Sequence, residues 1–192
     1  MVEDLGFGGE VAGFYHQYRR GYPPAVIDTL IGTFGLTGDD IVFDVGCGTG
    51  QLTLPIARRV RAVAGVDPEP DRLARARQAA AEQGIRNANW LLGADTDIPA
   101  LAALLGGRRA GAVTIGQALH WMRYRELMPR LAPLLRPGGG IAVITNGTPM
   151  WLQDSPWSRA LRSFLEPWLG RPGASSVGHV LGRYSKACVW RR

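Results

Sequence analysis

The chain has 192 residues, enough for one domain with a sizeable core, and it carries a formal net charge of +6. Lys186 is the only lysine, and the arginines are scattered beside acidic residues without interleaved aromatic side chains, which argues against a nucleic-acid groove. No apolar run approaches the length of a membrane span, and Cys47 and Cys188 give no framework for disulfides or a metal. We therefore expect a cytoplasmic protein without nucleic-acid, membrane or metal partners.

Two helices are predicted ahead of the first strand. Residues 11–18 have helical character and bring Tyr15 close to Tyr18 in the sequence. The segment Pro24–Phe34 combines a proline at the helix start with apolar residues at helical spacing, and Gly35 follows as a stop signal. A buried strand is predicted next, over Ile41–Val45, because this stretch is rich in β-branched and aromatic residues.

Three glycines follow this strand at alternate positions, Gly46, Gly48 and Gly50. Glycine accepts a positive φ and lets a ligand approach the backbone, and the apolar spacing up to Val60 predicts a helix whose first N–H groups face that ligand. A dinucleotide favours Gly-x-Gly-x-x-Gly, but Gln51 stands where the third glycine would be. A carboxylate in this strand, Asp44, would repel a pyrophosphate and suit a ligand with an ammonium or sulfonium charge.

The run Asp44-Val-Gly-Cys-Gly-Thr-Gly50 resembles the cofactor loop of the class I S-adenosylmethionine-dependent methyltransferases. The resemblance implies S-adenosyl-L-methionine as the cofactor. The position of Cys47 in the glycine turn favours a small side chain that fills space over a nucleophile. The residues of this run that it places at the cofactor are Asp44, Gly46, Cys47, Gly48 and Gly50.

A second string, Tyr18-Arg-Arg-Gly-Tyr-Pro23, resembles the corresponding segment of a small-molecule branch of the family, similar to methyltransferase type 11. In that branch the N-terminal segment folds over the cofactor as a lid. The resemblance therefore implies a helical lid over residues 1–35, with Tyr15 at the cofactor. An ordinary helix that packs on the sheet is the alternative.

An acidic residue, Asp67, ends the second predicted strand, residues 62–66, and precedes a helix predicted over residues 70–83. At the end of a βαβ half-unit, such a carboxylate can accept bonds from both ribose hydroxyls of an adenosine cofactor. A helix N-cap is the alternative role. The resemblance adds the neighbouring Pro68 to the cofactor contacts.

The third predicted strand, residues 90–93, is followed by Ala94-Asp-Thr-Asp-Ile-Pro99. The family commonly has an aspartate here that accepts a bond from the adenine amino group. Alignment on the shared Asp-x-Pro places Ala94 at that position, with Asp95 one residue later. Asp95 is the better chemical candidate, and Thr96 lies beside it.

The fourth predicted strand, residues 112–116, leads into Gln117-Ala-Leu-His-Trp121. Ligands of open α/β sheets lie beyond the carboxyl ends of the strands, where the strand order reverses, so His120 and Trp121 should border the reactive methyl group. The string resembles the same branch and implies that Gln117 binds the cofactor. His120 is the candidate general base, and a capping or packing role is its alternative.

The C-terminal third begins with a helix over residues 126–135, a turn over 136–140 and a fifth strand over 141–145. A helix is predicted from Ser155 to Trp168, and it carries an aromatic and apolar face. This face either packs in the core or covers the acceptor. Only 22 residues follow Gly170, fewer than the family's final antiparallel hairpin requires, and residues 187–190 alone have strand character. We therefore expect the final hairpin to be truncated and the tail to cover part of the edge of the fifth strand. We also expect homo-oligomers to form through this strand edge.

Together these features predict an α/β, Rossmann-like, doubly wound and mostly parallel sheet of order 3-2-1-4-5. The expected organisation is a lid over residues 1–35, a cofactor-binding core over 36–150, and a C-terminal helix and tail over 151–192. The expected function is transfer of a methyl group to oxygen, nitrogen or carbon of a small-molecule acceptor. A catalytically weak or inactive S-adenosylmethionine-binding protein and a nicotinamide oxidoreductase are the alternatives.

Overall fold

A computed structural model of the chain describes residues 21–103, 109–145, 155–156, 159–160, 163 and 188–191. The chain divides into two compact units, Met1–Val143 with Cys188–Arg192, and Ile144–Ala187. Tyr15 and most of the aromatic face predicted between Ser155 and Trp168 lie outside the described residues. None of the helices in the described ranges is both long and apolar enough to cross a membrane.

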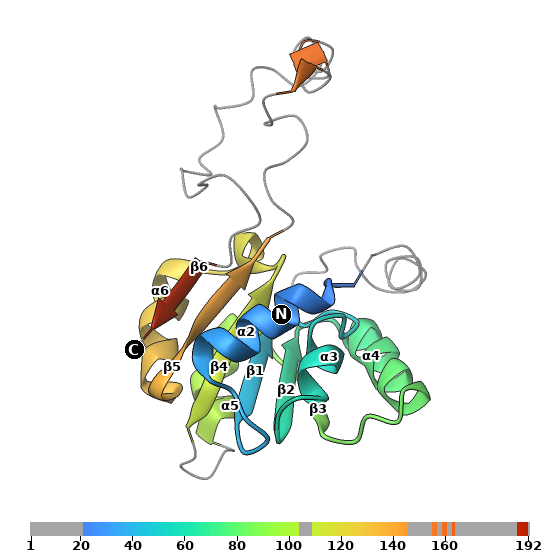
Figure 1. Cartoon of the computed structure of the whole chain (residues 1–192), viewed down its shortest axis with the longest axis vertical. Coiled ribbons are helices and arrows are strands. Elements are labelled where there is room, and N and C mark those ends of the chain that lie inside the picture. Colours follow the sequence, from blue (N-terminus) through green and yellow to red (C-terminus); the bar gives the residue numbers. More distant parts are fainter. Residues whose placement is uncertain are drawn as a thin grey trace. The chain divides into compact units, whose positions relative to one another are not determined.

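A six-stranded sheet forms the centre of the first unit. Its strands are β1 (Ile41–Val45), β2 (Ala62–Asp67), β3 (Ala88–Leu92), β4 (Ala110–Gly116), β5 (Leu135–Ile144) and β6 (Cys188–Arg191). Their order is β3-β2-β1-β4-β5-β6 (Figure 1). The pairs β1–β2, β1–β4 and β2–β3 are parallel, and β6 is antiparallel to β5. The predicted fold class and strand order are confirmed.

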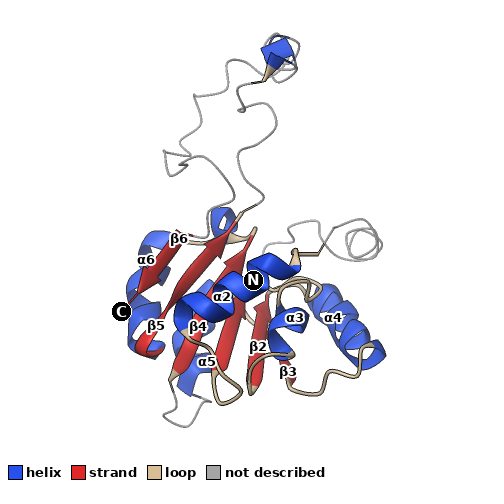
Figure 2. Cartoon of the chain, viewed as in Figure 1, coloured by secondary structure: helices blue, strands red, loops and turns tan. Residues whose placement is uncertain are grey.

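Helices cover both faces of this sheet. Figure 2 shows α2 (Pro24–Phe34), α3 (Thr53–Ala57) and α4 (Pro70–Glu82) in front of it, and α5 (Ile98–Ala103) and α6 (Tyr124–Leu131) behind it. The alternation of side chains along β1 divides the core accordingly: Phe43 and Val45 belong to the same buried cluster as Ile98, Leu127 and Leu131 of the rear helices. Asp44 therefore points to the opposite face, toward α3.

Several elements begin and end where local signals place them. Helix α2 has proline at its first position and ends at Gly35, whose φ of 54° lets the N–H of Leu36 close the helix on the carbonyl of Ile31 at 2.9 Å. Strand β1 has the predicted bounds, with four buried residues in succession. In α4, Leu73, Ala76 and Ala80 are buried, as the helical spacing of apolar residues in this segment requires.

Two predicted helices are shorter in the structure. Helix α3 ends at Ala57 rather than Val60, and Val60 is buried without being helical, so its apolar spacing indicated burial and not helix length. The helix predicted to reach residue 135 ends at Leu131 and continues as a 3-10 turn, η3 (Ala132–Leu134). Pro133 has no N–H with which to continue α-helical bonding.

Three strands begin earlier than predicted, among them β4, which starts at Ala110 rather than at residue 112. Strand β3 starts at Ala88 rather than Trp90, because Ala88 already pairs with Val63 of β2. Strand β5 starts at Leu135 and includes the predicted turn over residues 136–140. A Cβ atom at Gly139 would lie 2.7 Å from the carbonyl oxygen of Gly111 in β4, so glycine permits a close approach of the two backbones there.

The edge of β5 is paired by β6, as the predicted partial cover by the tail requires. Four consecutive pairs run from Gly140 opposite Arg191 to Val143 opposite Cys188. Pairing satisfies backbone groups of the edge on which the prediction of homo-oligomers depended. That prediction has no support in the described chain.

Candidate functional site

The glycine turn after β1 is fastened to the end of β2. Gly46, Gly48 and Gly50 have φ values of 72°, 55° and 88°, as their predicted role requires. The N–H groups of Gly46 and Cys47 both donate to the carbonyl of Val66, at 2.8 and 3.0 Å. The Gly48 N–H donates to the Asp67 carboxylate at 2.8 Å. The turn is therefore held in one conformation by the neighbouring strand.

Close packing is a second reason for glycine in this turn. A Cβ atom at Gly46 would lie 2.5 Å from Cβ of Ala118 and 3.0 Å from Cε of Met122. A Cβ atom at Gly50 would lie 2.8 Å from Cη2 of Trp90 in β3. The segment that follows β4 thus crosses directly against the turn that follows β1, which places both at the point where the strand order reverses.

Asp67 lies at the carboxyl end of β2 and is 2% exposed. One oxygen accepts the Gly48 bond, and the other accepts a 3.0 Å bond from the N–H of Glu69. Burial raises the pKa of Asp67, although these two N–H donors and the nearby charge of Arg72 oppose the increase. Each carboxylate oxygen can accept a further bond, so the group can bind a ligand hydroxyl while it holds the turn.

Asp44 lies in β1, beneath the turn, and is 1% exposed. Its oxygens accept bonds from the hydroxyls of Thr53 at 2.6 Å and Thr114 at 2.8 Å. Burial raises the pKa of Asp44 to about 6, against the effect of the two hydroxyls, and the charge of Asp67 adds to the increase. The carboxylate is thus a buried acceptor whose described partners are neutral.

Cys47 is buried in the same turn, with only 6% exposure. Burial raises the pKa of the Cys47 thiol well above its usual range, and the charges of Asp44 and Asp67 raise it further. Nucleophilic cysteines require the opposite shift. This agrees with the prediction that the Cys47 side chain fills space.

Three buried polar atoms in this region have no hydrogen-bond partner within the described chain: Thr49 Oγ1, Gln51 Nε2 and Gln117 Nε2. Buried polar groups are normally paired, so such a group signals a strain or a missing ligand. Gln117 is also the only non-glycine residue in the described ranges with a positive φ, 57°, which is a strained conformation typical of functional sites. The sequence motif had indicated Gln117, whereas no local signal had indicated Thr49 or Gln51.

Asp95 and its neighbours form a separate part of the carboxyl edge. They lie in a 3-10 turn, η1 (Asp95–Asp97), where Thr96 is exposed. Asp95 Oδ2 accepts a 2.9 Å bond from the N–H of Arg123, at the start of α6. The N–H of Ala94 donates to Asp97 within the turn, at 2.8 Å.

His120 belongs to the 3-10 turn η2 (Leu119–Trp121) and is exposed. Its ring centroid is 5.1 Å from that of Trp121, with the planes tilted by 48°. The contacts described above join Asp67, the glycine turn and the segment after β4, while Asp44 bonds to Thr53 and Thr114. His120 and Thr96 are exposed. Pro68 is half-buried beside Asp67. The described residues contain no group of three or more His, Cys, Asp or Glu side chains that could hold a metal.

Comparison with known proteins identifies relatives of this chain. The family profile described as "Methyltransferase domain" matches residues 42–139, from β1 to β5. An uncharacterized methyltransferase of Mycobacterium tuberculosis is 37% identical over 142 residues, which are 74% of this chain and 52% of that protein. The chain thus spans about half the length of this curated relative.

Solved structures share the fold at lower identity. An rRNA methylase from Streptococcus thermophilus has a TM-score of 0.54 and 19% identity, over 73% of this chain and 76% of that one. A geranyl diphosphate methyltransferase, in complex with GPP and sinefungin, has a TM-score of 0.52 and 19% identity, over 74% of this chain and 52% of that one. At this identity the two structures establish the fold alone.

Proposed function

Because the chain belongs to the methyltransferase domain family, we propose that it binds S-adenosyl-L-methionine at the glycine turn and transfers the methyl group to a small-molecule acceptor. The observation that carries the proposal is the juxtaposition of this turn with Asp67 at the end of β2. Backbone that a ligand can approach closely and a carboxylate that can accept from ribose hydroxyls meet there within hydrogen-bond distance.

The hydrogen-bond donors and acceptors of the site fit the amino-acid end of S-adenosyl-L-methionine as well as its adenosine. Buried carboxylates, Asp44 and Asp67, suit the positive charge of the cofactor. Three groups without a described partner can bind polar groups of the cofactor: the side-chain amides of Gln51 and Gln117, which donate, and the Thr49 hydroxyl, which donates or accepts. We also propose, from the family resemblance, cofactor contacts by Gly46, Cys47, Gly48, Gly50, Pro68, Asp95, Thr96 and Tyr15, the last from a lid over residues 1–35.

When bound, the cofactor supplies a methyl group that its sulfonium has already activated. The chain's own task is then to hold the acceptor in line with that methyl group and to keep water away. Most of the turn is buried, which suits both tasks. His120 is the candidate that would remove a proton from the acceptor, and its exposure in η2 leaves the imidazole accessible to a substrate.

The acceptor class is the least constrained part of the proposal. Of the two solved structures with this fold, one is a geranyl diphosphate methyltransferase and the other an rRNA methylase, so the fold alone permits either class. The scattered arginines and the lack of interleaved aromatic residues favour a small molecule. Methyl transfer from radiolabelled S-adenosylmethionine to catechol, indole, spermidine, citrate and rRNA would compare the classes directly.

Equilibrium binding separates this proposal from its alternatives. We expect calorimetry to detect S-adenosylhomocysteine binding and no binding of NAD at the same concentration. NAD binding without S-adenosylhomocysteine binding would establish the oxidoreductase alternative and contradict the proposal. Tight S-adenosylhomocysteine binding with no methylation of any acceptor in the panel would favour the inactive binding protein.

The role of His120 can be tested in the same assay. If His120 is the base, His120→Ala should lower turnover by about 10²-fold or more and leave the S-adenosylhomocysteine affinity unchanged. His120→Gln, which retains a polar side chain without a titratable imidazole, should be equally impaired. Equal losses of turnover and affinity in His120→Ala would make it a packing residue, and unchanged turnover would remove it from the site.

A further inference from the structure

Asp95 connects two loops that lie far apart in the sequence. It stands in η1, directly after β3, and its Oδ2 atom accepts the N–H of Arg123 at 2.9 Å, across 28 residues. Arg123 lies between η2 and α6. A carboxylate that accepts from a backbone N–H forms a charge-assisted bond, stronger than a neutral one. The loop after β4 is therefore fixed from the loop after β3.

Exposed apolar side chains gather on these two segments. Among the described residues, the large hydrophobic side chains that are exposed are Leu92 at 62%, Trp121 at 59% and Tyr124 at 47%. Trp121 and Tyr124 flank Arg123, the residue whose N–H Asp95 holds, and Leu92 is the last residue of β3, three positions before Asp95. Single exposed apolar residues are common, but two exposed aromatic side chains close to one residue held by Asp95 can form a binding surface.

These observations point to a surface for the acceptor. The segment that carries His120 and Trp121 begins at the switch point, where Ala118 packs against Gly46 of the glycine turn. Trp121 and His120 form a tilted ring pair, and the guanidinium of Arg125 lies 6.0 Å from the centroid of the Tyr124 ring. Flat apolar groups bind well against such aromatic side chains.

We propose that Asp95 is a positioning residue for the acceptor: through the Arg123 N–H it fixes the segment that presents Trp121 and Tyr124 to an acceptor with a flat, apolar part. The catalytic consequence rests on the methyl transfer proposed above. This positioning role of Asp95 differs from a direct contact with the adenine. Such a contact would use the second carboxylate oxygen of Asp95. The two roles predict different effects, on turnover at saturating cofactor and on cofactor affinity.

The structure offers a conservative variant and a matched control. Asp95→Asn keeps an oxygen that can accept from Arg123, whereas Asp95→Ala removes it. Asp97 lies in the same turn and also accepts a hydrogen bond from a backbone N–H. That bond has a similar length, 2.8 Å, but its donor is Ala94, only three residues away. Asp97→Ala therefore disturbs the same turn without releasing the loop after β4.

Amide hydrogen exchange of the labelled full chain, followed by NMR, tests the bond without any acceptor. We expect Asp95→Ala to raise the exchange rate of the Arg123 amide at least tenfold and to shift the resonances of Trp121 and Tyr124. Asp95→Asn and Asp97→Ala should change that rate by less than about threefold. An unchanged Arg123 rate in Asp95→Ala, or an equal rise in Asp97→Ala, would overturn the inference.

Turnover supplies the functional arm. At saturating S-adenosylmethionine and with catechol or indole as acceptor, Asp95→Ala should lower turnover at least tenfold, and Asp95→Asn should restore it to within about threefold of the parent. Unchanged turnover in Asp95→Ala, or methylation confined to spermidine and citrate, would overturn the inference. If the parent chain fails to bind S-adenosylhomocysteine, the proposed function fails, and the exchange rates still report separately on the Asp95 bond.

Discussion

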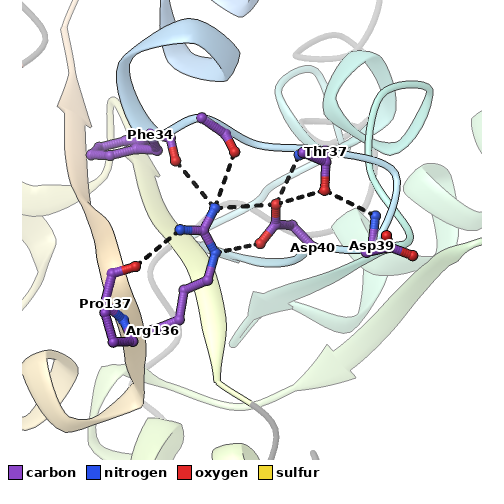
Figure 3. Close-up of polar contacts among 7 residues, drawn as sticks. Phe34, Thr37, Asp39, Asp40, Arg136 and Pro137 are labelled. Carbon is purple, nitrogen blue, oxygen red and sulfur yellow. Dashed lines mark hydrogen bonds and ion pairs between the residues drawn. The ribbon is translucent and has the colours of Figure 1, made fainter.

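Two aspartates at opposite ends of β1 occupy contrasting environments. Asp40, just before the strand, is 9% exposed and pairs with the Arg136 guanidinium of β5, with 2.6 Å between Nε and Oδ1 (Figure 3). Asp44, four residues later, is 1% exposed, and its described hydrogen-bond donors belong to two neutral residues, Thr53 and Thr114. One strand thus carries a charge-compensated carboxylate at its amino end and an uncompensated one at its carboxyl end.

The amino end is a closed network. Arg136 also donates to the carbonyl groups of Phe34 at 3.2 Å and Gly35 at 3.1 Å, so that it ties β5 to the end of α2, and Thr37 donates to Asp40 through its N–H and hydroxyl (Figure 3). Burial alone would raise the pKa of Asp40, but Arg136 and Thr37 outweigh it and lower the pKa.

The contrast separates stability from function. At the amino end the strong donors and acceptors are matched inside the protein, as expected where the sheet must only be held together. At the carboxyl end a buried carboxylate has a raised pKa, and buried polar atoms of Thr49, Gln51 and Gln117 have no described partner. Groups left unmatched at a strand end are those that a polar, cationic ligand can match.

The largest effect on stability is expected from breaking the amino-end network. Arg136→Met would leave Asp40 buried without its cation, and we expect a loss of about 3–5 kcal/mol in the free energy of unfolding, measured by urea denaturation at pH 7. The control is Arg59→Met, which removes an exposed pair with Asp28 and should cost less than about 1 kcal/mol. Equal losses in the two variants would contradict the comparison.

Asp44→Asn should change the free energy of unfolding in the opposite direction. Because the folded pKa is about 6 and the ordinary value 3.8, ionisation disfavours the folded state, and the stability associated with Asp44 is lost as pH rises from about 4 through about 6. Asp44→Asn should remove this loss and stabilise the cofactor-free protein at pH 8 by on the order of 3 kcal/mol. The Thr53 and Thr114 hydroxyls can reorient to accept from the new amide.

Asp40→Asn is the matched variant for this test. Its folded pKa is lowered, so its contribution is present above the ordinary pKa and is lost as pH falls through the folded value. Asp40→Asn should therefore destabilise the protein at pH 8, where Asp44→Asn stabilises it. Urea denaturation of both variants at pH 4.5 and 8 would measure the two changes in the free energy of unfolding. A change of the same sign in both variants at pH 8 would show that the two ends of β1 do not differ.

Gly35→Ala gives the smallest expected effect on stability, and Gly46→Ala is compared with it for its effect on binding. Gly35 has a φ of 54° and open space around a Cβ atom, so Gly35→Ala should cost about 1 kcal/mol and leave S-adenosylhomocysteine affinity unchanged. Gly46 has a φ of 72°, and its Cβ atom would contact Ala118 at 2.5 Å. Gly46→Ala should therefore also abolish binding in calorimetry, and retained affinity would argue against a ligand at this turn.

Local signals predicted much of this architecture. The bounds of α2 and β1 follow from proline and glycine positions and apolar spacing. The family follows from the glycine motif, and the resemblance to that family supplied the strand order and the expected partial cover of β5 by the tail. The element bounds depend on residues that are neighbours in the sequence, where propensity and periodicity act. The ends of α3 and α6 could not be located in this way, because burial continued beyond the helix in one and Pro133 changed the helix type in the other.

The bonds that define the site lie beyond the reach of such signals. Thr114 donates to Asp44 across 70 residues, and Arg136 reaches Asp40 across 96. No periodicity specifies which threonine or arginine arrives at a given carboxylate, since register and strand order decide it. The cofactor roles assigned by resemblance, and the catalytic role of His120, stay predictions.

Calorimetric titration of S-adenosylhomocysteine into Asp67 variants tests the central claim most directly. Asp67→Ala removes both proposed bonds to the ribose, each worth about 1.5–3 kcal/mol, so it should bind at least tenfold more weakly than the parent. Asp67→Asn keeps one acceptor oxygen without the charge, so its affinity should fall between the two. Asp71→Asn, an exposed aspartate of α4, should bind within about twofold, and circular dichroism should confirm that all variants are folded. If folded Asp67→Ala binds S-adenosylhomocysteine as tightly as the parent, the cofactor does not lie at the end of β2.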